Sequence, residues 1–327
     1  MRVVHWLAAA AAAVGLISGQ VGAAAQDFSK QDFPTRSISL VTPYTAGGPY
    51  DILARFMSEA LRKQKLSHPV IVEAKPGGNT LVGIQHVLNA PADGHTLLIA
   101  TLPITANLIL MKNPGYKAED FVAVGPVARH PYILFVPASL PVSNLAELVA
   151  YAEKNPNKLN IGALSPGGQV QLLADRFLRA SKLKIEKIPY KGAAELATAL
   201  LTGDIQMSFF AYSAGAPFLK DGKLKPIAIA TDERSALTPD IPTFKELGMP
   251  SVTGEAWVAL FARSNTPKPV VEKLQAMITE ASKDSDYVAK IRGAGNDPWV
   301  IAPDKIAEHF KADAKFWEAD LRAIEPQ

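Results

Sequence analysis

The sequence contains no cysteine. This absence excludes a disulfide framework, a thiolate zinc site, an iron–sulfur cluster and a cysteine nucleophile. It also means that the stability of the fold does not depend on the redox state of its compartment.

The sequence also lacks a large excess of charge and the histidine spacing of a metal site. It has 34 Lys and Arg against 31 Asp and Glu, a net charge of +3, whereas a nucleic-acid-binding protein needs clustered basic residues. None of the six histidines stands four residues from another or in an H-E-x-x-H motif. We therefore expect no nucleic-acid partner and no bound metal.

Long apolar runs are missing beyond the N-terminus. Arg2 and His5 precede an uncharged, alanine-rich run from Trp6 to Ile17, and residues 22–25 form an A-x-A type of site. This pattern predicts a secretory signal peptide over residues 1–25, cleaved before Gln26. The alternative is a membrane anchor, which needs about 20 apolar residues, and the run is too short for it. The rest of the chain is expected to be soluble.

The chain has enough apolar residues, 48% of 327, for about two domains with full cores. Apolar segments at residues 37–41, 70–72 and 96–100 alternate with amphipathic helical patterns, which predicts a βαβαβ unit with buried parallel strands. The pattern restarts at residues 132–136, and the tail from Lys268 is helical. We predict two α/β lobes with the C-terminal helices as an added layer.

Two glycine-rich loops, residues 42–51 and 163–169, each follow an apolar strand and open an amphipathic helix. Glycine lets a ligand approach the backbone, and the free N–H groups at a helix start favour anions. The two loops would suit a small carboxylate held across a cleft without positive side chains. The same pattern also fits two ordinary turns. Asp51 would either compete with an anion or satisfy the N–H groups of its own loop.

The second loop could also be taken for a catalytic motif. Gly162 and Gly167 have the spacing of a phosphate loop, but Gly168 stands where the lysine is needed. Ser165 at a strand-to-helix turn suggests a nucleophile elbow. There the residue after the serine donates its N–H to the oxyanion, and Pro166 has none. This argues against a serine hydrolase.

With these loops, the chain resembles the periplasmic receptors of tripartite tricarboxylate transporters, the Bug family. The matching motifs run in order along nearly the whole chain after residue 25: residues 43–51, 54–55, 75–77, 93–98, 107, 155–162, 189–192, 222–224, 239–243, 257, 260–262 and 266–267. The resemblance implies an α/β, type II-like periplasmic-binding-protein fold with two lobes, each a sheet flanked by helices, and two crossover strands. Lobe 1 would comprise residues 26–130 and 256–327, lobe 2 residues 131–255, and the hinges would lie near residues 128–131 and 253–257.

The resemblance further implies a periplasmic solute-binding receptor and not an enzyme. It would close on a small organic acid as a monomer without a cofactor, and would deliver the acid to two membrane permease subunits. The candidate ligand-binding residues are Tyr44, Thr45, Ala46, Gly47, Gly48, Tyr50, Asp51, Thr101, Ser165, Gly167, Gly168, Gln169, Tyr190, Phe210 and Tyr212.

Several positions depart from the family pattern, and most of the changes add aromatic or apolar surface. Tyr50 replaces a small residue or threonine, Leu164 and Gln169 alter the second loop, and residues 209–212 read Phe-Phe-Ala-Tyr in place of polar residues. We hypothesise a ligand with a flat or apolar body, walled by Tyr50, Phe210 and Tyr212. The alternative is that Phe209 or Phe210 belongs to the core. Two other functions stay open: a solute sensor for a two-component kinase, and a secreted hydrolase.

Overall fold

Two β-sheets organise the structure, a computed structural model that describes residues 33–164 and 167–324. The described residues belong to one compact unit. The predicted signal peptide, residues 1–25, lies outside the described residues.

The first sheet combines the predicted βαβαβ unit with strands from later in the chain, in the order β11-β4-β10-β3-β1-β2. β1 pairs in parallel with both β2 and β3, whereas β10 runs antiparallel to β3 and β4. The strands are β1 (Ile38–Thr42), β2 (Val70–Ala74), β3 (Thr96–Ala100), β4 (Phe121–His130), β10 (Ala256–Arg263) and β11 (Asp297–Pro298).

The second sheet is built from the middle of the chain, in the order β7-β6-β8-β5-β9. β6 pairs in parallel with β7 and β8, and β5 pairs antiparallel with β8 and β9. Its strands are β5 (Tyr132–Pro137), β6 (Asn160–Ala163), β7 (Glu186–Pro189), β8 (Met207–Ala211) and β9 (Leu224–Ile229).

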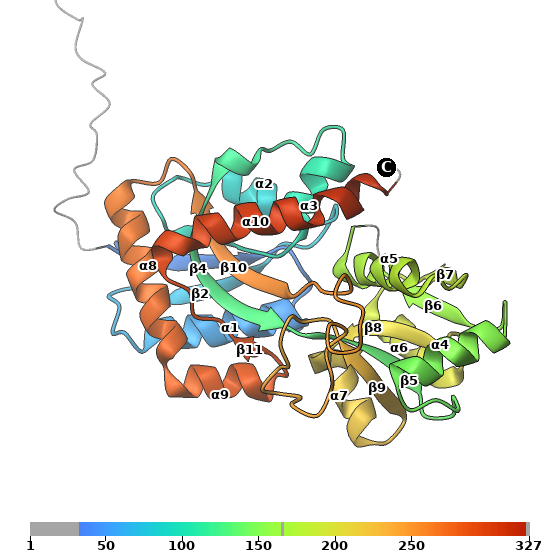
Figure 1. Ribbon diagram of the computed structural model, residues 1–327. Helices are drawn as coiled ribbons and strands as arrows, with labels where there is room; N and C mark the ends of the chain where they lie inside the picture. Colours follow the sequence, from blue (N-terminus) through green and yellow to red (C-terminus); the bar gives the residue numbers. More distant parts are fainter. Residues whose placement is uncertain (1–32, 165–166, 325–327) are drawn as a thin grey trace, which may run out of the picture. The chain divides into compact units, whose positions relative to one another are not determined.

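Helices cover the sheets, as Figure 1 shows. α1 illustrates why they form: Leu53, Met57 and Leu61 recur at helical spacing and are buried, while Arg55 and Arg62 face outward. The helices are α1 (Pro49–Arg62), α2 (Leu81–Asn89), α3 (Pro103–Leu110), α4 (Leu145–Lys154), α5 (Gln169–Ser181), α6 (Ala193–Thr202), α7 (Tyr212–Lys220), α8 (Lys268–Lys283), α9 (Ser285–Gly293) and α10 (Pro303–Arg322), with a 3₁₀ turn at Ala118–Asp120.

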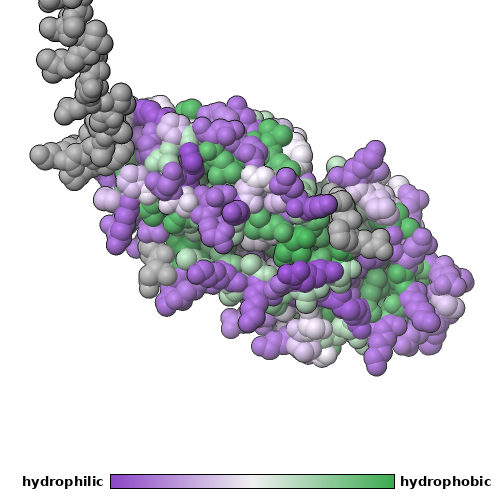
Figure 2. All heavy atoms as spheres, turned by 90° about the horizontal axis from the view of Figure 1, so that it is seen from above, coloured by the Kyte–Doolittle hydropathy of each residue, from purple (hydrophilic) through white to green (hydrophobic). Residues whose placement is uncertain are grey.

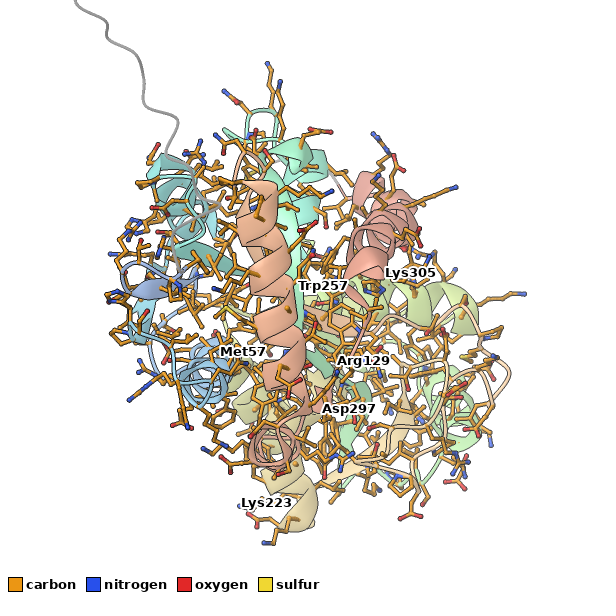
Figure 3. The ribbon with its side chains drawn as sticks, turned by 90° about the vertical axis from the view of Figure 1, so that its left-hand side faces the viewer. Met57, Arg129, Lys223, Trp257, Asp297 and Lys305 are labelled. Carbon is orange, nitrogen blue, oxygen red and sulfur yellow. The ribbon has the colours of Figure 1, made fainter. Side chains whose placement is uncertain are left out.

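Each sheet has its own core. One cluster on the first sheet holds apolar residues of α1, α8 and α9, and a second cluster holds residues of α2 and the start of α10. The core of the second sheet includes Phe135, Phe177 and Phe209, which have no exposed surface. Full burial of one such side chain stabilises the fold by about 1.5–3 kcal/mol. Figure 3 shows Met57 among the helices that cover the first sheet.

The chain passes between the sheets at three places. β4 ends at His130 and β5 begins at Tyr132, and the return lies in the residues before β10, which begins at Ala256. α10 makes the third connection, since it starts against the first sheet while Trp317 and Leu321 lie in the core of the second. This connection was not predicted. The proposed lobe boundaries, 26–130 with 256–327 and 131–255, stay a prediction.

The surface of the described residues is mainly hydrophilic in the view of Figure 2, with hydrophobic residues in smaller patches. The large apolar side chains exposed on the described residues are few and scattered: Ile52, Ile71, Val82, Leu247, Val300 and Phe316. Among the described helices, none has the length and apolar character needed to cross a bilayer.

Candidate functional site

A small cavity lies where the two glycine-rich loops meet, and we call it the loop cavity. Its volume is about 180 Å³, below the roughly 300–1,000 Å³ of typical pockets for drug-sized ligands. One wall comes from the side of the first sheet and the other from the side of the second. The lining residues are Tyr44, Tyr50, Asn79, Thr101, Pro103, Ala106, Tyr132, Leu164, Gly167, Gly168, Gln169 and Val170.

The first loop leads from β1 into α1 and is held together by Asp51. Asp51 is fully buried; its carboxylate accepts hydrogen bonds from the Gly47 N–H at 2.9 Å and from Arg55 Nε at 2.8 Å. The carboxylate therefore occupies one backbone donor that a ligand would otherwise use, and Arg55 balances its charge. This geometry supports the second of the two roles considered for Asp51, the satisfaction of loop N–H groups.

Aromatic rings from this loop form one side of the cavity. The ring centroids of Tyr44 and Tyr50 lie 4.2 Å apart, and the Tyr44 hydroxyl is 2.5 Å from Thr101 Oγ1. Burial raises the pKa of Tyr50 to about 12 and raises the pKa values of Tyr44 and Tyr132 further. All three phenols therefore stay neutral at physiological pH, and they offer hydroxyl groups without adding charge.

The second loop leads from β6 into α5 and presents an uncapped helix start. Gly168 is the N-cap residue and offers no side chain to cap the helix. No acceptor among residues 33–164 and 167–324 is recorded for the N–H groups of Gly168, Gln169 and Val170. All three residues line the loop cavity. The start of α5 thus lines the cavity with backbone groups that have no acceptor in residues 33–164 and 167–324, and the positive end of a helix favours a bound anion.

Gly167 is required in the second loop by its conformation and by its surroundings. Its φ of +76° is in the left-handed region, and a Cβ atom at this position would lie 2.3 Å from Leu110 Cδ1. Leu110 ends α3, so the second loop is packed directly against an element that follows the first sheet.

No side chain that lines the loop cavity is ionisable near neutral pH. The polar amide of Asn79 is held in place, because its Nδ2 donates to Asn107 Oδ1 at 2.8 Å and Asn107 Nδ2 donates back to the Asn79 carbonyl at 2.9 Å. The cavity can therefore bind an anion through N–H and hydroxyl groups only. It offers neither a nucleophile with an adjacent base nor a general acid.

The structure brings six of the predicted site residues together. Tyr44, Tyr50 and Thr101 line the loop cavity from the first sheet, and Gly167, Gly168 and Gln169 line it from the second. Thr45, Ala46, Gly47, Gly48 and Asp51 lie in or beside the first loop without lining the cavity. Ser165 lies outside the described residues.

The other predicted residues lie elsewhere on the second sheet. Phe210 is 3% exposed and packs edge-on against Phe135, and Phe209 is fully buried, so both phenylalanines belong to the core. Tyr190 follows β7, and Tyr212 begins α7. None of Tyr190, Phe210 and Tyr212 lines the loop cavity, and their contact with a ligand stays a prediction.

Half of the residues that line the loop cavity carry no strong signal in the sequence. Pro103 and Ala106 lie on α3, which has no clear amphipathic pattern, and Tyr132 was assigned only to a strand. Asn79 could have been suspected, because it follows Gly77 and Gly78 and adopts a left-handed conformation with φ of 48°. The remaining two lining residues are Leu164 and Val170.

A second and larger cavity, the hinge-side cavity, lies beside the two crossovers. It measures about 760 Å³ and is lined by Arg129, Thr231, Asp232, Glu233, Arg234, Ser235, Ala236, Thr253, Gly254, Glu255, Trp257, Arg292, Asp297, Pro298, His309, Ala312, Asp313 and Phe316. Figure 3 shows Arg129, Trp257 and Asp297 near one another. Most of its charged groups already have partners within the protein.

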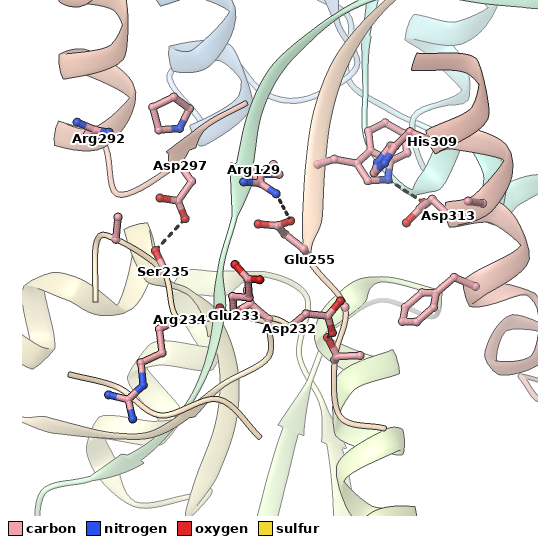
Figure 4. A pocket seen from close by; sticks show the side chains of 18 residues that line it. Arg129, Asp232, Glu233, Arg234, Ser235, Glu255, Arg292, Asp297, His309 and Asp313 are labelled. Atoms are coloured by element: carbon pink, nitrogen blue, oxygen red, sulfur yellow. Dashed lines mark hydrogen bonds and ion pairs between the residues drawn. The ribbon is translucent and has the colours of Figure 1, made fainter. Parts of the chain in front are cut away.

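Three contacts organise the hinge-side cavity (Figure 4). Arg129 Nη1 donates to Glu255 Oε2 at 2.9 Å, Ser235 Oγ donates to Asp297 Oδ2 at 2.8 Å, and Trp257 Nε1 donates to Asp313 Oδ2 at 2.7 Å. Burial raises the pKa of Glu255 to about 7, although Arg129 opposes this, and burial raises the pKa of Asp313 to about 6. We select the smaller loop cavity as the candidate site because both glycine-rich loops line it, its side chains are neutral, and the described residues supply no acceptor for the first N–H groups of α5.

Comparison with known families identifies the group to which the chain belongs. Residues 53–324 match the family of tripartite tricarboxylate transporter receptors. The chain belongs to this family. It is similar to protein BugT of Bordetella pertussis, with 28% identity over 95% of this chain and 96% of the relative. It is also similar to a UPF0065 protein of Cupriavidus necator, with 32% identity over 97% of this chain and 95% of the relative.

Solved structures agree with this assignment. A Rhodopseudomonas palustris protein solved with adipate is 30% identical, with a TM-score of 0.80 over 90% of this chain and 100% of that one. MatC of the same species, solved with malate, is 28% identical, with a TM-score of 0.75 over 88% of this chain and 100% of that one. The periplasmic binding protein BugD is 27% identical, with a TM-score of 0.76 over 90% of this chain and 100% of BugD.

The predicted two-lobed α/β fold is therefore confirmed. The family consists of receptors and not enzymes, and this excludes the secreted hydrolase that the second loop had left open.

Proposed function

We propose that this chain is a periplasmic receptor that captures a small organic carboxylate between its two lobes. It would then deliver the acid to the two permease subunits of a tripartite tricarboxylate transporter. The observation that carries the proposal is the uncapped start of α5, whose Gly168, Gln169 and Val170 line the loop cavity. Three N–H groups at the positive end of a helix, with no acceptor among the described residues, suit a carboxylate.

The cavity also sets the size and character of the ligand. A volume of about 180 Å³ suits a molecule of few heavy atoms. Much of the wall is apolar, because it consists of the rings of Tyr44, Tyr50 and Tyr132 and the side chains of Leu164 and Val170. We therefore propose an acid with an apolar or aromatic body, in which one carboxylate meets α5 and the rest contacts the tyrosines.

The relatives are consistent with this reading without fixing the ligand. One was solved with adipate, whose four methylene groups separate two carboxylates, and another with malate, which is shorter and more polar. The largely apolar wall of the loop cavity suits the methylene chain of adipate better than the short, polar malate. Export to the periplasm is proposed from the signal-like residues 1–25 and from the periplasmic relatives.

Titration calorimetry with a panel of acids tests the proposal. The panel comprises benzoate, phenylacetate, hexanoate, adipate, malate and citrate, and the neutral control is the amide of each acid. We expect at least one of the first four to bind more tightly than malate and citrate, and its amide to bind weakly or not at all. Tight binding of malate or citrate alone would contradict the apolar body. Equal binding of acid and amide would contradict the carboxylate.

A further inference from the structure

The C-terminal helix α10 is packed against the cores of both sheets. Near its start, Phe310 packs on Trp257 and Phe261 of β10, with ring centroids 4.4 Å and 4.9 Å apart. Near its end, Trp317 and Leu321 are fully buried in the core of the second sheet. Figure 1 shows α10 in red, running from the side of the first sheet toward that of the second.

One side chain of α5 anchors the end of α10. Arg176 is 8% exposed, and its Nε and Nη2 donate to Asp320 Oδ2 at 2.9 and 2.7 Å. The guanidinium carbon lies 4.1 Å from the ring centre of Phe316 and 4.2 Å from that of Trp317. A buried guanidinium that donates two N–H groups to one carboxylate oxygen and lies against two aromatic rings is held in one orientation, which a lysine would not reproduce.

The same arginine also contacts the second crossover. Arg176 Nη1 donates to the Thr253 carbonyl at 2.5 Å, and a Cβ atom on the neighbouring Gly254 would lie 2.2 Å from the Trp317 ring. Arg176 therefore joins α5, α10 and the crossover before β10 at one point.

The contacts of Arg176 fix the position of the second loop. Arg176 and Gly168 are eight residues apart, about 12 Å along one rigid helix, so an anchor at Arg176 sets the position of the N–H groups of α5. Leu321 of α10 and Leu110 of α3 lie beside Gly167, at 3.5 Å and 2.3 Å from where its Cβ would stand. The second loop is thus held by α10 in two ways, through Arg176 on α5 and through the contact of Leu321 with Gly167.

We infer that Arg176 is a positioning residue for the second ligand-binding loop, and that α10 acts through it as a third connection between the lobes. The inference rests on the proposed carboxylate function of the loop cavity. The part of α10 beyond Phe316 moves with the second sheet, while Phe310 stays on the first. Closure therefore bends α10 or shifts it over residues 311–315.

Arg176→Lys tests this role, and Arg179→Lys is the matched control. Arg179 lies on the same helix and pairs with the same Asp320, but its side chain is 55% exposed. With adipate as the probe, at a temperature where circular dichroism shows every variant folded, we expect Arg176→Lys to raise the Kd about tenfold and Arg179→Lys to change it less than twofold. A purely structural role would lower the melting temperature of Arg176→Lys and leave the Kd of the folded protein unchanged.

A second measurement needs no ligand. Because the chain has no cysteine, spin labels can be placed at Arg62→Cys on α1 and Lys154→Cys on α4, both exposed and on opposite sheets. We expect Arg176→Lys to broaden the distribution of distances between the labels, and Arg179→Lys to leave it unchanged. An unchanged distribution in Arg176→Lys would overturn the inference, as would an unchanged adipate Kd. If the wild type binds no acid, the proposed function fails, and the label distances still decide the role of Arg176.

Discussion

The loop cavity and the hinge-side cavity of this receptor differ in the charge of their lining. The loop cavity measures about 180 Å³ and is lined by neutral side chains, whereas the hinge-side cavity measures about 760 Å³ and is lined by five carboxylates, three arginines and a histidine. In the larger space Arg129 pairs with Glu255, and Asp297 and Asp313 accept hydrogen bonds from neutral side chains, so most of its charged groups already have a partner. We propose that the smaller space, where the first N–H groups of α5 have no acceptor among the described residues, is better suited to an anion.

Two neighbouring residues at the end of β4 show most clearly how the charged and the neutral side of the molecule are separated. Arg129 lines the hinge-side cavity, while His130 lies beside the ring of Tyr50, at 5.6 Å between ring centroids. Successive side chains of a strand point to opposite faces. Burial lowers the pKa of His130 to about 4, so this histidine is neutral at physiological pH. The crossover thus separates a neutral side, where the ligand is proposed to bind, from a charged side.

Placing a charge in the loop cavity should break the contrast most severely. Gly168 has the extended φ and ψ of an ordinary N-cap, −79° and 150°, so Gly168→Asp would cap α5 and occupy its N–H groups. We expect the Kd for adipate to rise by about 100-fold, or ~2.7 kcal/mol. The melting temperature should stay the same or rise. Calorimetry and thermal unfolding measure the two effects.

Gly168→Asn and Gly168→Ala are the controls for this variant. Asn caps the helix without a charge, and Ala does neither. The step from Ala to Asn therefore reports the loss of donors, and the step from Asn to Asp reports charge repulsion. Wild-type affinity in all three variants would remove the start of α5 from the site.

Removing an aromatic wall should have a smaller effect. Tyr50→Thr takes away the ring that packs 4.2 Å from Tyr44, and we expect adipate and phenylacetate to bind about tenfold more weakly, or ~1.4 kcal/mol. Malate should be affected less. The control is Tyr212→Thr, because Tyr212 does not line the loop cavity. A larger loss from Tyr212→Thr than from Tyr50→Thr would restore the sequence-based wall of Phe210 and Tyr212.

These two variants also mark what the sequence could predict. The βαβαβ unit, both glycine-rich loops and the neutral character of the site follow from local signals, since strand and helix periods and glycine positions are read within about ten residues. The partners of a buried residue are not local. Phe210 packs on Phe135 because β8 pairs with β5, a contact that no local signal shows, while its predicted contact with a ligand stays a prediction.

Two of the elements that were not predicted, α3 and β4, have a physical reason in the sequence. α3 is apolar on several sides, so Pro103–Leu110 shows no amphipathic stripe. β4 contains Gly125 and Pro126, which argue against a central strand, yet it pairs with β10 through register shifts at these positions. The role of α10 in two cores was also hidden, because Trp317 and Leu321 indicate an apolar face without indicating whose core it joins.

On the charged side, Glu255→Gln should change the pH dependence of stability. The pKa of Glu255 is raised from 4.5 to about 7, so the folded state binds more protons than the unfolded state between these values. Wild-type stability therefore falls as the pH rises from about 4.5 to 7, and the Gln variant lacks this loss. We expect Glu255→Gln to match the wild type near pH 4.5 and to melt a few degrees higher at pH 8.

Glu246→Gln provides the control of opposite sign. The hydrogen bond from the Thr243 N–H and the ion pair with Arg234 lower the pKa of Glu246. Its charge therefore favours the folded state above the unfolded pKa, and this contribution is lost as the pH falls through the folded pKa. Removing it should not stabilise the protein at pH 8. A Glu255→Gln variant with a lower melting temperature than the wild type at pH 8 would mean that the pair with Arg129 outweighs the cost of burial.

The smallest effect is expected from the hydrogen bond between the Tyr44 and Thr101 hydroxyl groups, which orders the loop cavity without an ion pair. Thr101→Val keeps the shape of the side chain and removes the partner of the Tyr44 hydroxyl, now 2.5 Å away. We expect a loss of about 1 kcal/mol in stability and about a threefold rise in the Kd for adipate, since the freed hydroxyl can still reach a ligand or water in the cavity. Thr45→Val is the control, because Thr45 is exposed and its hydroxyl has no partner recorded among the described residues. If Thr101→Val and Thr45→Val have the same stability and the same Kd, the packing of the Tyr44 ring on Tyr50 holds the Tyr44 hydroxyl in place. The polar groups of the loop cavity are then ordered by aromatic contacts and not by hydrogen bonds between hydroxyl groups.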